Sequence, residues 1–103
     1  MNSSIRDEDP RHKRLCDIVE KHCEKHDCVV LRNYVYDEKG VIGEIDVLTA
    51  DQYGLCMYEI KSKHTSSSYR KAREQFERFY NSHKDIGQSI RGIYVTPTRI
   101  RRL

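Results

Sequence analysis

The chain has 103 residues, of which 37% are hydrophobic and 34% are charged, and its formal net charge is +3. This length suits one compact domain and excludes two independent cores, and no apolar stretch approaches the roughly 18 residues of a membrane span. Residues 1–10 are polar and lack the apolar core of a secretory signal. We therefore predict an N-terminal tail over residues 1–10, a single domain over residues 11–103 and an intracellular location, cytoplasmic or nucleoid-associated.

The first third of the chain predicts a helix followed by a strand. Over residues 10–25, mostly apolar side chains recur at helical spacing, which predicts an amphipathic helix. Asp9 before Pro10 is a helix start signal. Residues 28–36 are rich in valine, leucine and tyrosine, which is typical of a strand. The expected buried stripe of the helix is Leu15, Ile18, Val19, His22 and Cys23.

Two turns divide the middle of the chain into three strands. Residues 37–40 are polar, end in glycine and fit a hairpin loop, so residues 41–49 should return antiparallel to the first strand. Residues 51–54 supply a second turn, and residues 55–61 then form the third strand of a meander.

The last third predicts a second helix and a fourth strand. Residues 65–68 offer helix-capping hydroxyls, the helix should end near Ser82 or His83, and residues 89–96 form a strand that Pro97 stops. Because the helix lies between strands three and four, the last strand can return by a right-handed crossover and pair in parallel. We predict an α/β fold, a mixed β-sheet flanked by helices in the order α-β-β-β-α-β. The helix residues expected to pack are Tyr69, Ala72, Phe76, Phe79 and Tyr80.

Two acids interrupt the apolar strands in the middle of the chain. Asp46 ends the string Gly-Glu-Ile-Asp, and Glu59 begins the string Glu-Ile-Lys that ends at Lys61. Alternate side chains of a strand share a face, so Glu59 and Lys61 should point the same way. A buried carboxylate is costly unless a cation compensates it, and adjacent strands could direct both acids at one divalent ion.

These two strings, together with the element order, resemble the PD-(D/E)XK nuclease superfamily, which contains restriction endonucleases and archaeal Holliday-junction resolvases. The resemblance covers residues 11–96 and implies a restriction-endonuclease-like sheet. Asp46 matches the superfamily's aspartate, Glu59 its second acid and Lys61 its lysine. The proline that usually precedes the aspartate is replaced here by Ile45.

The resemblance also implies roles for two helical residues. Compact resolvase-like members have a helical glutamate at the metal site, and Glu20 is expected at that place. Gln75 resembles a glutamine on the helix that follows the Glu-x-Lys strand. The implied catalytic residues are Glu20, Asp46, Glu59, Lys61 and Gln75. The implied ligands of Mg²⁺ or Mn²⁺ are Asp46, Glu59, the carbonyl of Ile60, and Glu20.

The function that the resemblance implies is hydrolysis of DNA phosphodiester bonds by a Mg²⁺-dependent endonuclease. The more specific function is that of a Holliday-junction resolvase, which acts on branched or structured DNA in recombination and repair. Such an enzyme is expected to be a homodimer, because it cuts two strands symmetrically. One alternative is a nuclease of the same superfamily acting on other DNA structures in repair, restriction or mobile elements. Another is an inactive nucleic-acid-binding module, in which Asp46, Glu59 and Lys61 form a buried ion-pair cluster.

Basic and hydroxyl residues after the Glu-x-Lys string are candidates for phosphate contacts, although solvated helix faces and a flexible connector give the same pattern. They are Lys63, Ser66, Ser67, Arg70 and Arg73.

The cysteines are expected to be reduced, because the chain shows no export signal. Their spacing favours small buried side chains, and a structural zinc site using Cys23, His26 and Cys28 is the alternative. The four cysteines are Cys16, Cys23, Cys28 and Cys56.

Overall fold

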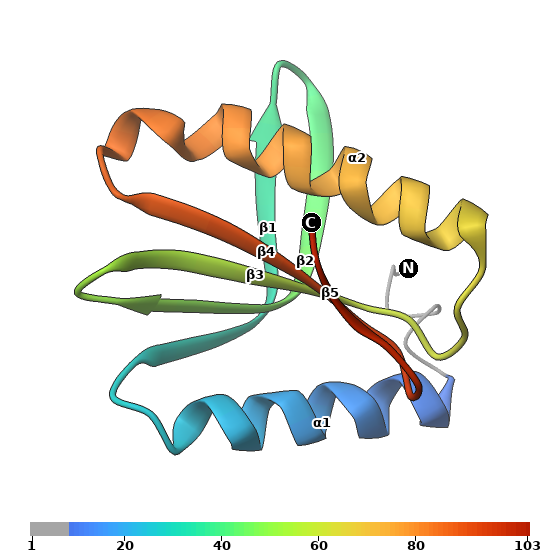
Figure 1. Ribbon diagram of the computed structural model, residues 1–103. Helices are drawn as coiled ribbons and strands as arrows, with labels where there is room; N and C mark the ends of the chain where they lie inside the picture. The colour runs from blue at the N-terminus through green and yellow to red at the C-terminus, as the bar shows by residue number, and fades with distance from the viewer. Residues whose placement is uncertain (1–8) are drawn as a thin grey trace.

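The structure, a computed structural model that describes residues 9–103, has two helices on opposite sides of one five-stranded sheet (Figure 1). The predicted α/β fold with a mixed sheet between helices is confirmed. No helix among the described residues is long and apolar enough to cross a membrane. The elements are α1 (Pro10–Glu24), β1 (Val29–Glu38), β2 (Val41–Asp51), β3 (Gly54–Ile60), α2 (Ser66–His83), the 3-10 turn η2 (Lys84–Ile86), β4 (Ser89–Val95) and β5 (Ile100–Arg102).

The strands lie side by side in chain order, and within residues 9–103 only β3 and β4 pair in parallel. The helix α2 connects these two strands, so the predicted parallel pairing through a helical crossover is confirmed. The short strand β5 was not predicted. It returns antiparallel to β4 after a turn in which the Thr96 hydroxyl accepts hydrogen bonds from the backbone N–H groups of Thr98 (3.3 Å) and Arg99 (3.0 Å).

The first helix and its cap include the last two residues of the predicted N-terminal tail. The Asp9 carboxylate caps α1 by accepting a hydrogen bond of 3.0 Å from the backbone N–H of Arg11, and Pro10 occupies the first turn. Both residues therefore belong to the fold, and the rest of the predicted tail, residues 1–8, lies outside the described residues.

The buried face of α1 is rotated from the predicted stripe. Cys16, Val19 and Cys23 are buried, whereas Ile18 is 58% exposed and His22 is also exposed. The prediction was wrong at Ile18 and His22, because the face of α1 that packs on the sheet is centred on Cys16, Val19 and Cys23. Cysteine packs as a small hydrophobic side chain, which suits these buried positions.

Each helix covers its own hydrophobic cluster, so the sheet is packed on both faces. The α1 side joins Cys16, Val19 and Cys23 to Val47, Ile60 and Val95 of the sheet. The α2 side joins Phe79 to Tyr36, Ile45, Leu48 and Met57.

The strand β1 reverses its alternation at Asn33. Arg32 extends toward α1, where its guanidinium lies 3.0 Å from the carboxylate of Asp17. Tyr34, two residues later, extends toward α2 and shares a 2.9 Å hydrogen bond with His83. Regular alternation would place both side chains on one face. Asn33 has φ of +56°, a left-handed conformation that asparagine tolerates better than most residues, and this one residue produces the switch.

The strand β2 reverses at the same level of the sheet. Ile45 belongs to the α2-side cluster and Val47 to the α1-side cluster, although they are two residues apart. The pairs Arg32↔Val47 and Tyr34↔Ile45 flank this level, so Asp46 lies opposite Asn33. The irregular sheet geometry therefore occurs where the candidate site begins.

We expect Asn33→Val to lower the free energy of unfolding by about 1–2 kcal/mol, because a β-branched residue is disfavoured at positive φ. Asn33→Gly should be at least as stable as the wild type. Urea denaturation checks both, and Leu31→Val controls for valine at an exposed β1 position. Equal stability of the valine and glycine variants would contradict the role assigned to this conformation.

Candidate active site

Strands β2 and β3 separate at the two acids. Their ladder ends at the pair Val47↔Tyr58, beyond which β2 continues with β1, and β3 continues with β4. Asp46 and Glu59 are the next residue on each strand, so they lie where the sheet forks. The backbone N–H of Ile60 donates a 3.0 Å hydrogen bond to Oδ2 of Asp46, which spans the fork.

The fork opens into a small pocket of about 210 Å³. Asp46 is 5% exposed and Glu59 is 7% exposed, so both carboxylates lie in a largely water-excluded setting. Charges buried in this way require compensation by cations or hydrogen bonds. The pocket is lined by Asp9, His12, Asp46, Glu59, Ile60, Lys61 and Ser62.

Lys61 follows β3 directly and supplies one compensating charge. Its backbone N–H donates to the Val95 carbonyl at 2.9 Å, which extends the pairing of β3 with β4 by one residue. Its Nζ lies 3.3 Å from Oε2 of Glu59. The structure thus brings Asp46, Glu59 and Lys61 together, and Glu59 and Lys61 do point the same way.

Asp9 adds a third carboxylate that the sequence analysis assigned only to helix capping. Its Oδ2 accepts a 2.9 Å hydrogen bond from the Ser62 hydroxyl, and this bond, with that from the Arg11 backbone, holds the pKa of Asp9 below its usual value. The cap therefore also ties the start of α1 to the loop after β3.

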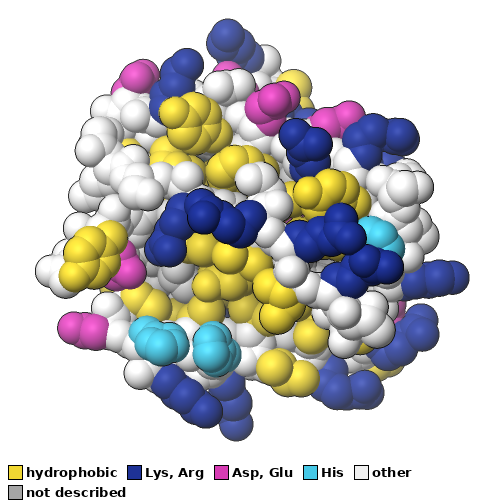
Figure 2. All heavy atoms as spheres, viewed as in Figure 1, with side chains coloured by type: hydrophobic (Ala, Val, Ile, Leu, Met, Phe, Trp, Pro, Cys, Tyr) yellow, Lys and Arg dark blue, Asp and Glu magenta, His cyan; other side chains and the backbone are white. Residues whose placement is uncertain are grey.

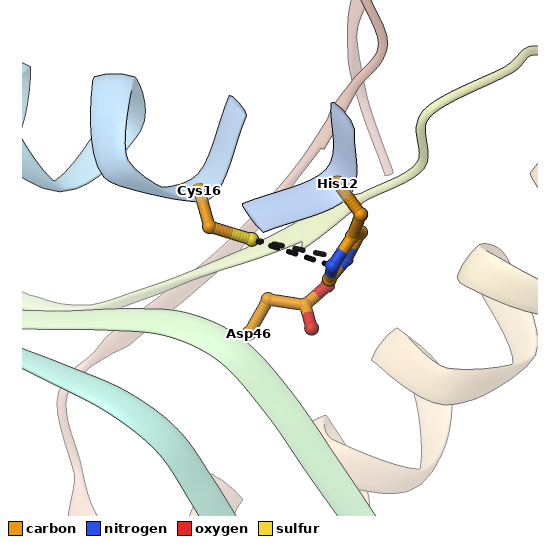
Figure 3. A group of neighbouring side chains, drawn as sticks. All are labelled: His12, Cys16 and Asp46. Atoms are coloured by element: carbon orange, nitrogen blue, oxygen red, sulfur yellow. Dashed lines mark hydrogen bonds and ion pairs between the residues drawn. The ribbon is translucent and has the colours of Figure 1, made fainter. Parts of the chain in front are cut away.

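His12 is the second residue of the pocket that sequence reasoning missed, since no spacing rule supported a histidine there. Its Nε2 lies 3.4 Å from Oδ2 of Asp46, and its two ring nitrogens lie 3.9 and 3.7 Å from Sγ of Cys16 (Figure 3). The contact with Asp46, followed by that with Cys16, raises the pKa of His12 to about 10. The contact with Asp46 thus favours the imidazolium form of His12.

We expect a pH titration of the metal-free protein to show this shift. An imidazolium stabilised in the folded state adds stability that is complete below pH 6.5 and is lost as the pH rises toward about 10. NMR titration of the His12 ring should give the raised pKa, and Asp46→Asn should return it toward 6.5. A His12 ring that titrates near 6.5 in the wild type would contradict the contact with Asp46.

Glu20 is not brought to this pocket, contrary to the role that the resemblance implied. Its Oε1 lies 2.8 Å from the guanidinium of Arg32, and its side chain faces a separate hollow of the α1 surface. The reason is the switch at Asn33, which sends Arg32 toward α1, where it pairs with both Asp17 and Glu20. His12, about two turns earlier, occupies the α1 side of the pocket instead.

Gln75 lies beside the site without lining the pocket. Its Nε2 donates to the Glu44 carbonyl at 2.7 Å, and its Oε1 accepts from the Tyr36 hydroxyl at 2.9 Å. These bonds fasten α2 to β2 next to Asp46. The Tyr36 ring also explains the glycine of the Gly-Glu-Ile-Asp string, because a Cβ on Gly43 would lie 2.3 Å from that ring.

The candidate DNA-contact residues are exposed near the start of α2. Arg70 and Arg73 line a shallow hollow of about 440 Å³ beside Tyr69, Phe76 and Tyr80. Figure 2, viewed as Figure 1, shows Lys and Arg side chains alongside hydrophobic ones across the middle of one face of the molecule. Lys63, Ser66 and Ser67 share the exposure.

The C-terminal hairpin brings further positive charge to the same region. Loss of solvent contact, followed by the charges of Arg99 and Arg101, lowers the pKa of His64. The arginines of this hairpin therefore lie close to the loop that joins β3 to α2. These two arginines therefore add positive charge beside His64, three residues after Lys61.

Comparisons with known proteins support the fold alone. No family model and no curated protein matches this chain. Among solved structures, the chain is similar to the crystal structure of a protein of unknown function, AF1548, with a TM-score of 0.60 and 17% sequence identity. The match covers 80% of this chain and 45% of that one, so this chain spans less than half of its neighbour's length.

Proposed function

We propose that this protein is a metal-dependent DNA endonuclease with a PD-(D/E)XK-type site. The observation that carries the proposal is the fork, where two buried acids on separating strands share one pocket with Lys61. A sheet that separates at this point leaves room for an ion and a phosphate. An uninterrupted ladder would fill that space with backbone.

The residues of the pocket fit a hard divalent cation. Mg²⁺ and Mn²⁺ prefer oxygen ligands, and Asp9, Asp46 and Glu59 offer three carboxylates at one place. Asp46, Glu59 and the carbonyl of Ile60 would hold the ion, and Asp9, which lines the same pocket, would accept a hydrogen bond from its bound water. When bound, the ion would supply a polarised water and neutralise charge on the scissile phosphate.

The chain's own groups have separate tasks in this proposal. Lys61 orients the attacking water and stabilises charge that develops on the phosphate, since its ammonium lies on a flexible stem beside Glu59. The Ile60 N–H fixes the orientation of the Asp46 carboxylate through its 3.0 Å bond. Gln75 is a positioning residue, because it acts on Asp46 through the Glu44 backbone.

The substrate that we propose is branched or structured DNA, with a four-way junction as the first case to test. Exposed basic residues support a polyanionic partner. Arg70 and Arg73 lie in the hollow beside α2, which Glu74 and Glu77 also line, and Arg99 and Arg101 lie near His64, in the loop that follows Lys61. A homodimer would place two such sites on one junction.

The test is a cleavage assay on labelled junction, flap and duplex DNA with Mg²⁺ or Mn²⁺, using wild type and Asp46→Asn. We expect metal-dependent cleavage by the wild type and none by the variant, with the junction cut preferentially. Cleavage of a different structure would retain the nuclease and reject the resolvase. Binding without cleavage of any substrate would reject both.

A second candidate, a non-catalytic nucleic-acid-binding module, is favoured by one observation. Asp46 contacts both His12 and the Ile60 N–H, and Glu59 contacts Lys61, so much of the buried charge is balanced within the chain. In that case Asp46→Ala and Glu59→Ala would leave every measured activity unchanged. Circular dichroism would confirm that both variants are folded.

A further inference from the structure

We propose that His12, Cys16 and Asp46 form a site for a thiophilic divalent ion such as Zn²⁺, separate in its donors from the Mg²⁺ site but sharing Asp46 with it. One nitrogen, one sulfur and one carboxylate oxygen lie within 4.8 Å of one another in this cluster. Figure 3 shows the three side chains converging between α1 and β2. The two helical ligands stand one turn apart, at i and i+4, on the face that meets the sheet.

The separations suit a tetrahedral ion. With typical Zn–S, Zn–N and Zn–O bonds of about 2.3, 2.05 and 2.0 Å, a tetrahedral angle requires an S···N separation of about 3.6 Å and an N···O separation of about 3.3 Å. The structure has 3.7 Å between Sγ of Cys16 and Nε2 of His12, and 3.4 Å between Nε2 and Oδ2 of Asp46. Both separations from His12 Nε2 are thus within about 0.1 Å of those that the ion requires. Sγ is nearly equidistant from both ring nitrogens. Binding therefore needs a turn of the imidazole and the release of one proton from His12 and one from the Cys16 thiol.

The charge and the surroundings also favour such an ion. A thiolate and a carboxylate together cancel the two charges of Zn²⁺, which suits ligands that are only 2% (Cys16) and 5% (Asp46) exposed. Thiolate and imidazole donors select Zn²⁺ or Co²⁺ over Mg²⁺. Three protein ligands leave one position, and His12 and Asp46 both line the open pocket, so that position faces solvent or a ligand.

The shared aspartate gives the site a regulatory consequence, which rests on the proposed function. An ion held by His12 and Cys16 takes the Asp46 carboxylate away from the Mg²⁺ site. Zn²⁺ would therefore inhibit Mg²⁺-dependent cleavage.

Cobalt spectroscopy of the purified, metal-free full chain tests the site without reference to DNA cleavage. We expect one equivalent of Co²⁺ to produce a near-ultraviolet thiolate-to-cobalt absorption band with visible bands of a tetrahedral ion. One equivalent of Zn²⁺ should abolish these bands. Cys16→Ala should lose the near-ultraviolet band, and His12→Ala should weaken or lose the tetrahedral spectrum.

The control is the double variant Cys23→Ala and Cys28→Ala, which removes two other thiols near His22 and His26 but should keep the band. Absence of a thiolate band in folded wild type, or its survival in Cys16→Ala, would overturn the proposal. Loss of the band only in the double variant would assign the metal to the other thiols and would also overturn it. If Cys16→Ala fails to fold, the cobalt spectrum of His12→Ala tests the site in its place. A positive spectrum without nuclease activity would leave the zinc site standing and reject only the proposed function.

Discussion

Replacing Lys61 by alanine should lower the rate of metal-dependent DNA cleavage by about 10²–10³-fold, the effect of removing one preorganised charge-stabilising group. The side chain is 33% exposed and its Nζ lies 3.3 Å from Glu59, so its removal deletes a cation at the pocket without opening the core. Single-turnover cleavage by saturating enzyme measures the chemical step. Binding to the same DNA, measured with Ca²⁺ in place of Mg²⁺, should persist.

Two matched variants sharpen this result. Lys21→Ala removes an exposed lysine from α1, outside the pocket, and should leave the rate unchanged. Lys61→Arg keeps the charge but replaces a compact ammonium by a planar guanidinium, so we expect partial activity. Undiminished cleavage by Lys61→Ala would mean that the lysine only balances Glu59.

Replacing Phe79 by alanine should lower the free energy of unfolding by about 3–5 kcal/mol, the usual cost of deleting a buried aromatic ring. Phe79 is fully buried, and its ring lies against Tyr36 at 5.5 Å and His83 at 4.3 Å between centroids. Because Tyr36 also bonds Gln75, the cavity would loosen the attachment of α2 beside Asp46. Urea denaturation measures the loss.

Tyr80 provides the control for this variant. It neighbours Phe79 on α2 but is 44% exposed, so Tyr80→Ala should cost about 1 kcal/mol or less. Similar losses in the two variants would contradict the assignment of Phe79 to the core and of Tyr80 to the surface. Helical spacing in the sequence predicts both residues on one packed stripe, and the exposure of Tyr80 corrects that prediction.

The main elements could be predicted because their signals are local. Glycine in the loop after β1, the Asp9–Pro10 start signal and the capping hydroxyls before α2 act on neighbouring residues, and the helices and strands follow them closely. The parallel pairing of β3 with β4 also followed, because a helical crossover leaves few other topologies. The strand β5 was not predicted, because its short, charged sequence forms a strand only by pairing with β4.

Some residues of the candidate site could likewise be predicted from local sequence signals, and others could not. Glu59 and Lys61 could be placed together from the sequence, because two positions on one strand fix their common direction. Asp9 and His12 could not, because they reach the pocket only through the packing of α1 on the sheet. Glu20 was misplaced for the converse reason, since its ion pair with Arg32 depends on a strand distortion at Asn33 that no sequence rule predicted.

The sequence by itself determined the class of fold and the order of its main elements. It also determined three charged residues of the site, which are Asp46 on one strand and Glu59 and Lys61 at alternate positions of the next. Tertiary structure alone decided where β2 leaves β3, which face of α1 meets the sheet, and which side chains therefore balance the buried acids. The physical reason is the separation along the chain over which each kind of interaction acts. Backbone conformation and side-chain alternation are set within a few residues, whereas burial and ion pairing depend on segments that meet only after the chain has folded.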